Sequence, residues 1–293
     1  MKQKSALPSW QKNDLESCAC PVCQSEQHIS GHVFEFPPFQ VVRCANCQLW
    51  YLSPRLKESV MLDVYADPSY FAGGGDSGYA DKDGHYRDQE TALRPTFRAF
   101  LGQMQKAGIE GGSLLEIGTS YGFFLQEAAS FFDTLSGTDF DAEAVKQVQA
   151  LGFQGLRGGL EAIPEGEQYN CISSMSVIEH VYDPVAFVKT LSGHLTPEGW
   201  MVFATPKING FWFKLMGKRW SSFKIPEHIT YYDVDTLSYL FHQAGAKQLK
   251  VLPYPAAYPL GLIAAKLGMK IPNRLAGLNF WLPGTMFAIA AQF

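Results

Sequence analysis

The sequence lacks any long uninterrupted run of hydrophobic residues. Its most apolar stretch, residues 251–269, is broken by Pro253, Pro255, Pro259 and Lys266, whereas a membrane-spanning helix needs about 20 consecutive apolar residues. The N-terminal residues are polar and contain no apolar segment of the length found in signal peptides. We therefore expect a cytoplasmic protein without a transmembrane segment. Contact of residues 251–269 with a membrane surface stays open, as does the oligomeric state.

An excess of charge of one sign is also missing. The 293 residues include 24 Lys and Arg, 28 Asp and Glu and 7 His, a formal net charge of −4, and 46% of them are hydrophobic. This hydrophobic content excludes a disordered chain. Residues 1–60 hold six basic and five acidic residues, a balance too even for a surface that follows nucleic-acid phosphates. A nucleic-acid partner is therefore not expected.

Only one cysteine, Cys171, occurs after residue 47, whereas five lie within residues 1–47. Four of them form two CxxC pairs with 20 residues between the pairs. Each pair can offer two thiolates to one tetrahedral zinc ion, and residues 32–44 between them have the composition of a short hairpin. Stable disulfides are disfavoured in a cytoplasmic chain. The sequence predicts a small ribbon around a structural zinc ion held by Cys20, Cys23, Cys44 and Cys47, and the role of Cys18 stays open.

Beyond residue 93, short apolar runs alternate with helical patterns. Helices are expected at 93–108, 123–132, 141–152, 186–195 and 233–246, and strands at 113–118, 134–140, 170–176, 199–205, 247–253 and 285–293. Such alternation predicts a doubly wound α/β sheet with parallel strands and right-handed crossovers. We expect a zinc-ribbon module at 1–55, a connecting or lid segment at 56–92 and an α/β domain at 93–293.

The first strand of this domain runs into Glu116-Ile-Gly118-Thr-Ser120-Tyr-Gly122, and an apolar helix follows directly. Small residues at the carboxyl end of a strand let a ligand approach the backbone in doubly wound folds. A carboxylate at position 116 would repel a pyrophosphate and attract a cation, such as a sulfonium that also carries an amino group. The turn also fits the GxSxG of α/β-hydrolases, but that interpretation leaves Glu116 without a role.

The second strand ends in Gly137-Thr-Asp139-Phe-Asp141. An acidic side chain at the tip of this strand can accept hydrogen bonds from both hydroxyls of a ribose. We assign that role to Asp139 and expect Asp141 to cap the following helix.

With these motifs the chain resembles class I S-adenosylmethionine-dependent methyltransferases, whose fold is a Rossmann-like sheet. Residues 114–125 are similar to their first motif, 137–141 to the second, 169–188 to the fourth-strand motif with its Glu-His pair, and 195–206 to the fifth. Ser120 and Glu198 stand where the family usually has glycine. The resemblance implies S-adenosyl-L-methionine as cofactor, held by Glu116, Gly118, Thr119, Ser120, Gly122, Asp139, Phe140, Gly159, Leu160 and Glu161, with Ser174 and Met175 beside the donor methyl group.

A narrower resemblance covers the ribbon, the Tyr-Gly-rich segment with GYADK, and residues 220–246. It is to ribbon-bearing methyltransferases of the deoxysugar and surface-glycan type, which implies a small sugar-like acceptor methylated at oxygen, nitrogen or carbon in glycan biosynthesis. One alternative is an RNA-modifying methyltransferase whose ribbon reads RNA. Another is a binding module that has lost methyl transfer. Ubiquinone-pathway O-methyltransferases carry a glutamate three residues before the Glu-His pair, where this chain has Ser176.

Methyl transfer to a hydroxyl or ammonium requires a base, and two histidines are candidates. His180 follows Glu179 near the expected donor methyl, and in the deoxysugar C-methyltransferases this pair is proposed as a catalytic dyad. A structural role for the pair at the start of a helix is an equal alternative. His228 lies in a segment similar to an acceptor-side loop, where it either contacts substrate or packs under aromatic residues.

Two further segments have no single interpretation. Residues 211–220 combine aromatic residues with Lys214, Lys218 and Arg219, which suits an ordinary lid, an anionic acceptor or a membrane surface. Tyr70, Tyr79 and Tyr86 either close over the cofactor or belong to a packed loop.

Overall fold

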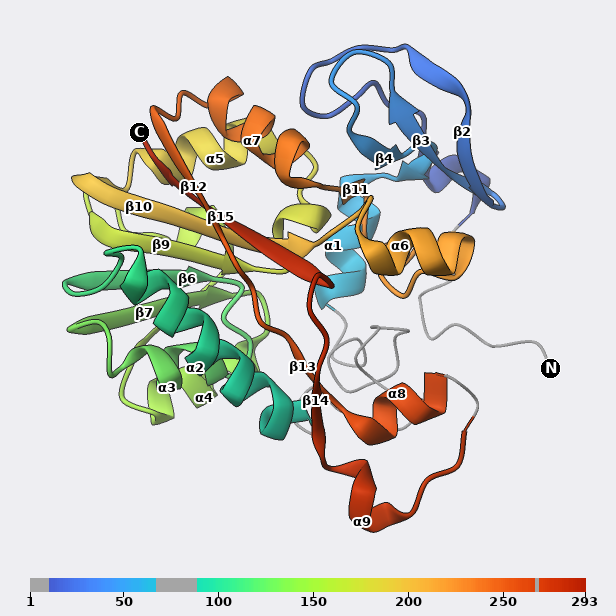
Figure 1. The fold of residues 1–293 in the computed structure, drawn as a ribbon. Helices are drawn as coiled ribbons and strands as arrows, with labels where there is room; N and C mark the ends of the chain where they lie inside the picture. Colours follow the sequence, from blue (N-terminus) through green and yellow to red (C-terminus); the bar gives the residue numbers. More distant parts are fainter. Residues whose placement is uncertain (1–10, 67–88, 267–268) are drawn as a thin grey trace.

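The structure is a computed structural model that describes residues 11–66, 89–266 and 269–293. A seven-stranded sheet in the order β12-β15-β10-β9-β6-β7-β8 forms its centre (Figure 1). Pairing is parallel from β10 to β8, whereas β15 runs antiparallel to both of its neighbours. The strands are β6 (Ser113–Ile117), β7 (Thr134–Asp139), β8 (Gln154–Arg157), β9 (Tyr169–Met175), β10 (Leu195–Pro206), β12 (Gln248–Leu252) and β15 (Met286–Gln292).

Helices cover both faces of this sheet because alternate residues of its strands are apolar on both sides. Met201 and Phe203 of β10 belong to one hydrophobic cluster, and Val202 and Ala204 belong to another. The first cluster contains apolar residues of α5 (Pro184–Ser192) and α7 (Val234–Gln243). The second contains those of α2 (Glu90–Lys106), α3 (Phe123–Ala128) and α4 (Ala142–Ala150). The predicted doubly wound α/β fold is therefore confirmed.

Side-chain caps fix where several helices begin. The Asp141 carboxylate accepts a hydrogen bond from the backbone N–H of Glu143 at 3.0 Å, as the sequence predicted for the start of α4. The Asp183 carboxylate likewise accepts a hydrogen bond from the backbone N–H of Ala186 at the start of α5. The first cap starts α4 immediately after β7, and the second starts α5 after the 3-10 turn that follows β9.

The N-terminal cysteine segment folds into a second, four-stranded sheet in the order β11-β4-β3-β2. The predicted hairpin is present as β2 (His28–Phe36) and β3 (Phe39–Cys44), followed by β4 (Trp50–Leu52). The fourth strand, β11 (Thr230–Tyr231), comes from the far end of the chain. The short strands β1 (Leu15–Glu16) and β5 (Arg55–Leu56) pair beside this sheet. The boundary of the zinc-ribbon module at residue 55 stays a prediction. The sheet of the ribbon also contains β11, which comes from residues well past that boundary.

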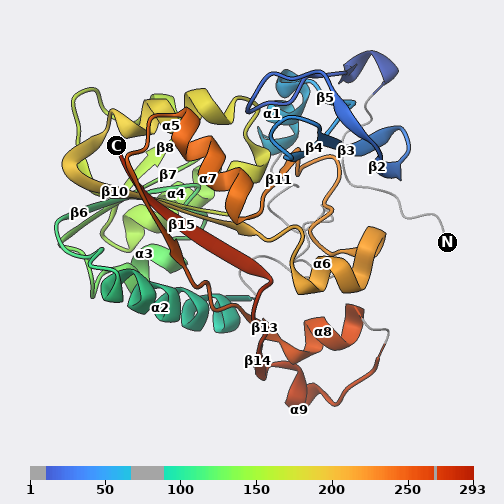
Figure 2. The same cartoon turned by 45° about the horizontal axis from the view of Figure 1, so that its top comes forward.

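Helix α1 (Glu58–Ala66) follows the ribbon. Most of the predicted lid, including Tyr70, Tyr79 and Tyr86, lies outside the described residues. Past the sheet edge lie α6 (Phe211–Met216), β13 (Ala257–Pro259), α8 (Leu260–Lys266), α9 (Asn273–Ala276) and β14 (Asn279–Trp281) (Figure 2). Within the described ranges, no helix combines the length and the hydropathy required to cross a bilayer.

Candidate active site

A cavity of about 1050 Å³ lies at the carboxyl ends of β6, β7 and β9. One part is lined by the turns that follow β6 and β7, including Gly118 and Asp139. Another part is lined by α1, the turn that contains Glu179 and His180, and residues 220–228. Most of the predicted nucleotide-binding residues and the predicted catalytic residues therefore face one continuous space.

Glu116 is buried on β6, with 3% of its surface exposed. Its Oε2 accepts a hydrogen bond from the Thr119 hydroxyl at 2.7 Å. Burial raises the pKa of this carboxyl group well above its ordinary value, and the nearby charge of Asp139 raises it further. A cation placed in the cavity beside Glu116 would favour the ionised carboxylate, and this fits a sulfonium or ammonium ligand better than a phosphate.

Asp139 ends β7 and ties the two ligand-binding turns together. Its Oδ2 accepts a hydrogen bond from the backbone N–H of Ser120 at 2.7 Å, and its Oδ1 accepts one from Asp141 N–H at 2.9 Å. Burial raises the pKa of Asp139, and these backbone hydrogen bonds oppose that shift. Each carboxylate oxygen can accept a second hydrogen bond, so the fixed carboxylate can still bind a pair of ribose hydroxyls.

Two glycines leave space that a side chain would fill. A Cβ on Gly118, whose φ is +73°, would lie 2.6 Å from Cγ2 of Val177. A Cβ on Gly159 would lie 3.0 Å from the ring of Phe140, which lines the cavity and is 49% exposed. The side chain of Glu161 accepts a hydrogen bond from Gly159 N–H at 2.8 Å. This arrangement leaves an aromatic face available to a flat ring such as adenine.

Most of the predicted cofactor residues line the cavity, and two do not. Gly118, Thr119, Ser120, Phe140, Gly159, Leu160, Glu161 and Met175 all do so, together with Glu116 and Asp139. Ser174 is fully buried in β9 and its hydroxyl has no hydrogen-bond partner among the described residues. Gly122 begins α3, where a Cβ would come within 3.1 Å of Val148. These two residues contribute to packing behind the cavity lining.

His180 lies in a single 3-10 turn, Ile178–His180, shortly after the end of β9. Its Nδ1 is 3.0 Å from the hydroxyl oxygen of Tyr65 on α1. Its ring also packs edge-to-face on that of His228, with centroids 4.7 Å apart. Burial, assisted by the positive charge of Lys224, lowers the pKa of His180 to about 3. The imidazole is therefore neutral near pH 7, and burial makes it a weak base, so a neighbouring negative charge such as ionised Glu179 would be needed to stabilise a proton on it.

Glu179 has a different partner from His180. Its Oε2 accepts a hydrogen bond from the Thr205 hydroxyl at 2.9 Å, while its Oε1 is buried with no hydrogen-bond partner in the described part of the chain. Burial raises the pKa of Glu179 to about 7. Within the described residues, the hydrogen bonds thus join His180 to Tyr65 and Glu179 to Thr205, and none joins the two members of the expected dyad.

His228 is 2% exposed, and its Nδ1 has no hydrogen-bond partner among the residues described. Burial lowers its pKa well below the ordinary value, with His180 and Lys224 contributing. The ligand atoms of Glu179, His180 and His228 lie within 4.8 Å of one another. One polar atom of each residue thus lies close to those of the other two, an arrangement that suits a polar group of an acceptor or a bound cation.

The sequence analysis did not identify Tyr65 or Lys224 as site residues. Tyr65 is 115 positions from His180 and reaches it only because α1 packs against the carboxyl end of the sheet. Lys224 lines the cavity and acts electrostatically on Glu179, His180 and His228. Its Lys-Ile-Pro context carries no recognisable signal of a site.

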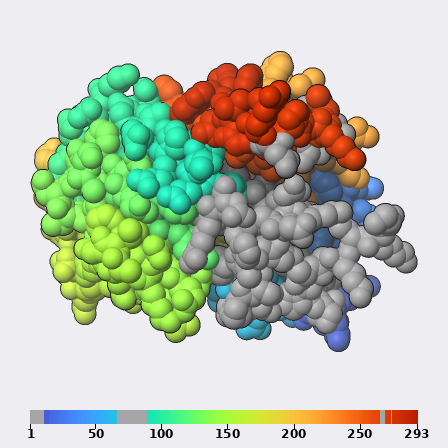
Figure 3. Space-filling view, turned by 90° about the horizontal axis from the view of Figure 1, so that it is seen from below, coloured from blue at the N-terminus to red at the C-terminus, as the bar shows by residue number. Residues whose placement is uncertain are grey.

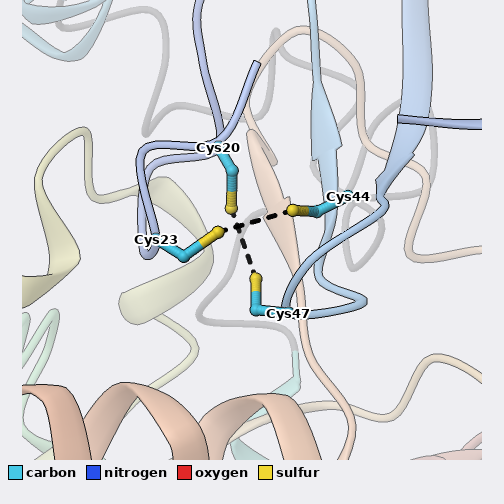
Figure 4. A group of neighbouring side chains, drawn as sticks. All are labelled: Cys20, Cys23, Cys44 and Cys47. Atoms are coloured by element: carbon cyan, nitrogen blue, oxygen red, sulfur yellow. Dashed lines mark hydrogen bonds between the residues drawn. The ribbon is translucent and has the colours of Figure 1, made fainter. Parts of the chain in front are cut away.

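The four predicted zinc ligands converge at the base of the ribbon (Figure 4). The Sγ atoms of Cys20 and Cys47 are 3.4 Å apart, and those of Cys23 and Cys44 are 3.5 Å apart. A tetrahedral zinc ion with Zn–S bonds of about 2.3 Å places its sulfurs about 3.8 Å apart, so a small outward movement would accommodate the ion. Cys18 lies outside the group, with its Sγ 3.6 Å from the carbonyl of Leu52.

Known proteins with similar sequences are methyltransferases. A family model for a methyltransferase domain matches residues 85–251. The ubiquinone biosynthesis O-methyltransferase of Bordetella bronchiseptica is 26% identical over 145 residues, covering 45% of this chain and 60% of that protein. The enzyme of the same name from Methylobacterium nodulans is 32% identical over 104 residues, covering 33% of this chain and 42% of that protein. The alignments thus span less than two thirds of these relatives.

A similar fold is found in a solved SAM-dependent methyltransferase from Archaeoglobus fulgidus. The TM-score is 0.51 at 14% sequence identity, and the match covers 71% of this chain and 99% of that one. The family match extends over more than half of the chain and includes the strands and turns that line the cavity. The chain belongs to the methyltransferase domain family.

Proposed function

We propose that this enzyme transfers a methyl group from S-adenosylmethionine to a hydroxyl of a small-molecule acceptor, with His180 as the proton acceptor. One observation carries the proposal: a single cavity is lined by Glu116 and Asp139 and also by His180 and His228. Methyl transfer requires donor and acceptor to meet in line at about 3 Å, and a shared cavity permits this.

The cofactor site is proposed on the residues that fit its chemistry. Glu116 would face the cationic end of the cofactor, Asp139 the ribose hydroxyls, and Phe140 with Gly159 the adenine ring. The buried, nearly unpartnered carboxyl of Glu116 supports this orientation, because a cation is the partner that stabilises its ionised form. Met175, at the end of β9, would lie near the donor methyl.

When bound, the cofactor supplies a methyl group on a sulfonium. The acceptor oxygen would take up this methyl group in place of its hydroxyl proton, and that proton would go to His180. Tyr65 holds the ring of His180 through the 3.0 Å contact and can pass the proton through its own hydroxyl. Glu179 and His228 would orient the acceptor from the wall of the cavity that they line.

Two acceptor classes are supported by different observations. The resemblance of the ribbon and residues 220–246 to glycan-type enzymes supports a sugar-like acceptor, and the group of Glu179, His180, His228 and Lys224 offers the hydrogen-bonding and charged atoms that such a molecule binds. The curated relatives are named ubiquinone biosynthesis O-methyltransferases, which supports O-methylation of an acceptor related to ubiquinone biosynthesis. In both classes the proposed reaction at His180 is the same.

We further propose that Cys20, Cys23, Cys44 and Cys47 hold a structural zinc ion. Four thiolates complete a tetrahedral coordination shell and leave no open position for catalysis. Cys20 and Cys44 share a hydrophobic cluster with Tyr232 and Leu237 of the methyltransferase domain. The ion would therefore stabilise the contact of the ribbon with this domain and would not take part in methyl transfer.

The test uses purified enzyme, cofactor labelled on its methyl group and a cell extract separated into small molecules, lipid-linked glycans, RNA and protein. The proposal predicts label in a small-molecule or lipid-linked fraction, and much less of it with His180→Gln. Lys106→Ala, an exposed change on α2, is the matched control. Label in RNA would instead support the RNA-modifying alternative. Cofactor binding without label in any fraction would favour the alternative of a binding module that has lost methyl transfer.

A further inference from the structure

Several large hydrophobic side chains are exposed on one side of the molecule, past the edge of the central sheet. Phe211 and Leu215 on α6 are 66% and 65% exposed. Met269, Leu278, Phe280 and Trp281, around α9 and β14, are between 45% and 58% exposed. We call α6 with the following turn (residues 211–219) and residues 269–281 the rim surface. In Figures 1 and 2 both parts lie on the same side of the sheet.

The charged residues within the two segments that form the rim surface are all basic. Residues 199–226 contain five Lys or Arg and no Asp or Glu, and the same is true of residues 236–293. Lys214, Arg219, Lys270 and Arg274 are exposed. The protein as a whole has a net charge of −4, so this basic charge is a local property of the rim.

The rim surface borders the mouth of the active-site cavity. The indole N–H of Trp212 on α6 donates a hydrogen bond to the carbonyl of Pro283, 2.9 Å away, and so ties α6 to the segment that directly follows residues 269–281. Trp212, Met216 and Phe280 also line the cavity. Figure 3 shows the C-terminal segment, in red, as a continuous part of the outer surface.

We propose that the rim surface docks the enzyme on an anionic lipid membrane. Exposed aromatic and aliphatic side chains interleaved with Lys and Arg are the combination that binds the headgroup region, where the rings enter the interface and the cations attract anionic lipids. The absence of acidic residues from both segments gives charge complementarity to such a surface. Docking places the cavity mouth at the lipid interface, so the proposal goes beyond methyl transfer and does not depend on it.

The test is flotation of the full chain with vesicles, without cofactor or acceptor. Vesicles of phosphatidylcholine with about one third phosphatidylglycerol should carry the protein, and pure phosphatidylcholine vesicles should carry at least about tenfold less. Phe211→Ser with Leu215→Ser should reduce binding about tenfold or more. Lys214→Glu with Arg219→Glu should do the same and should remove the dependence on phosphatidylglycerol.

Matched controls use similar residues away from the rim. Val251→Ser changes a side chain on β12 that is 55% exposed, and Lys106→Glu changes an exposed lysine on α2. Both should float as the wild type does, and thermal unfolding should show all variants folded. Failure of the wild type to float with anionic vesicles would overturn the proposal, as would equal binding by the Phe211/Leu215 variant. Concentration-dependent dimers lost in that variant, without flotation of the wild type, would assign the rim to a second copy.

Discussion

The hydroxyl of Tyr65 on α1 lies 3.0 Å from Nδ1 of His180, at the carboxyl end of the central sheet. This contact joins the segment after the ribbon to the proposed catalytic histidine. Because the ring of His180 is held between Tyr65 and His228, its orientation is fixed before substrate binds. Preorganisation of this kind lowers the cost of reaching the reactive geometry.

Tyr65→Phe removes the hydroxyl while keeping the ring, so it tests the contact without creating a cavity. We expect kcat to fall about tenfold or more and the cofactor Kd to stay unchanged. His180→Gln should lower kcat by about 10²–10⁴-fold, which is the usual contribution of a general base. Steady-state kinetics with equilibrium cofactor binding checks both. Unchanged kcat in His180→Gln would remove His180 from the mechanism.

The affinity for S-adenosylmethionine should depend on pH through Glu116. Burial raises the pKa of this carboxyl group, and a cationic ligand prefers the ionised form, so binding releases a proton. The affinity should therefore increase as the pH rises toward the raised pKa and level off above it. Glu116→Gln should bind about tenfold more weakly at high pH and lose this dependence. Calorimetry in buffers of different ionisation enthalpy measures the proton release, and identical pH profiles for both proteins would argue against this role.

The stability of the protein should depend on pH through Glu179. Its pKa is raised from 4.5 to about 7 by burial, so between these values the folded state binds more protons than the unfolded state. This contribution is complete below about pH 4.5 and is lost as the pH rises to about 7. The wild type should thus lose on the order of 1–3 kcal/mol relative to Glu179→Gln between pH 5 and pH 8.

Denaturant unfolding of both proteins across that range measures the difference. His180 works in the opposite direction, because its lowered pKa of about 3 gives stability that is lost only as the pH falls below its ordinary value. It is present in both proteins and largely cancels in the comparison. A constant difference between wild type and variant would contradict the assignment to Glu179.

Removal of zinc should destabilise the methyltransferase domain as well as the ribbon. Cys20→Ser should lose the metal and lower the unfolding temperature of the methyltransferase domain, because β11 of that domain pairs with β4 of the ribbon sheet. Cys18→Ser is the matched control and should retain one equivalent of zinc, since Cys18 stands outside the group of four. Elemental analysis and thermal unfolding provide the two readouts. A metal-free wild type with the same unfolding temperature would refute the structural role.

The central sheet was predictable from the sequence because each buried strand is a short apolar run between helical patterns. β8 was missed, because Gln154, Gly155 and Arg157 give it no apolar period. The two-residue strand β11 was missed for a different reason. Thr230 and Tyr231 form a strand only through their pairing with β4, a contact between distant parts of the chain that local propensity does not encode.

In the active site, residues at strand ends were predictable and side-chain partners were not. Asp139 was assigned from its place at the tip of β7. Glu179 and His180 are neighbours in sequence, and a catalytic dyad was one of the two roles that the sequence left open for them. In a 3-10 turn with about three residues per turn, neighbouring side chains point about 120° apart, so Glu179 meets Thr205 and His180 meets Tyr65.

A crystal structure of the enzyme with S-adenosylhomocysteine would test the central claim most directly. The account predicts that the ribose hydroxyls contact the Asp139 carboxylate, that the amino group of the ligand approaches Glu116, and that its sulfur faces the Tyr65–His180 pair across the cavity. A ligand whose ribose lies away from Asp139, or whose sulfur points away from His180, would contradict it.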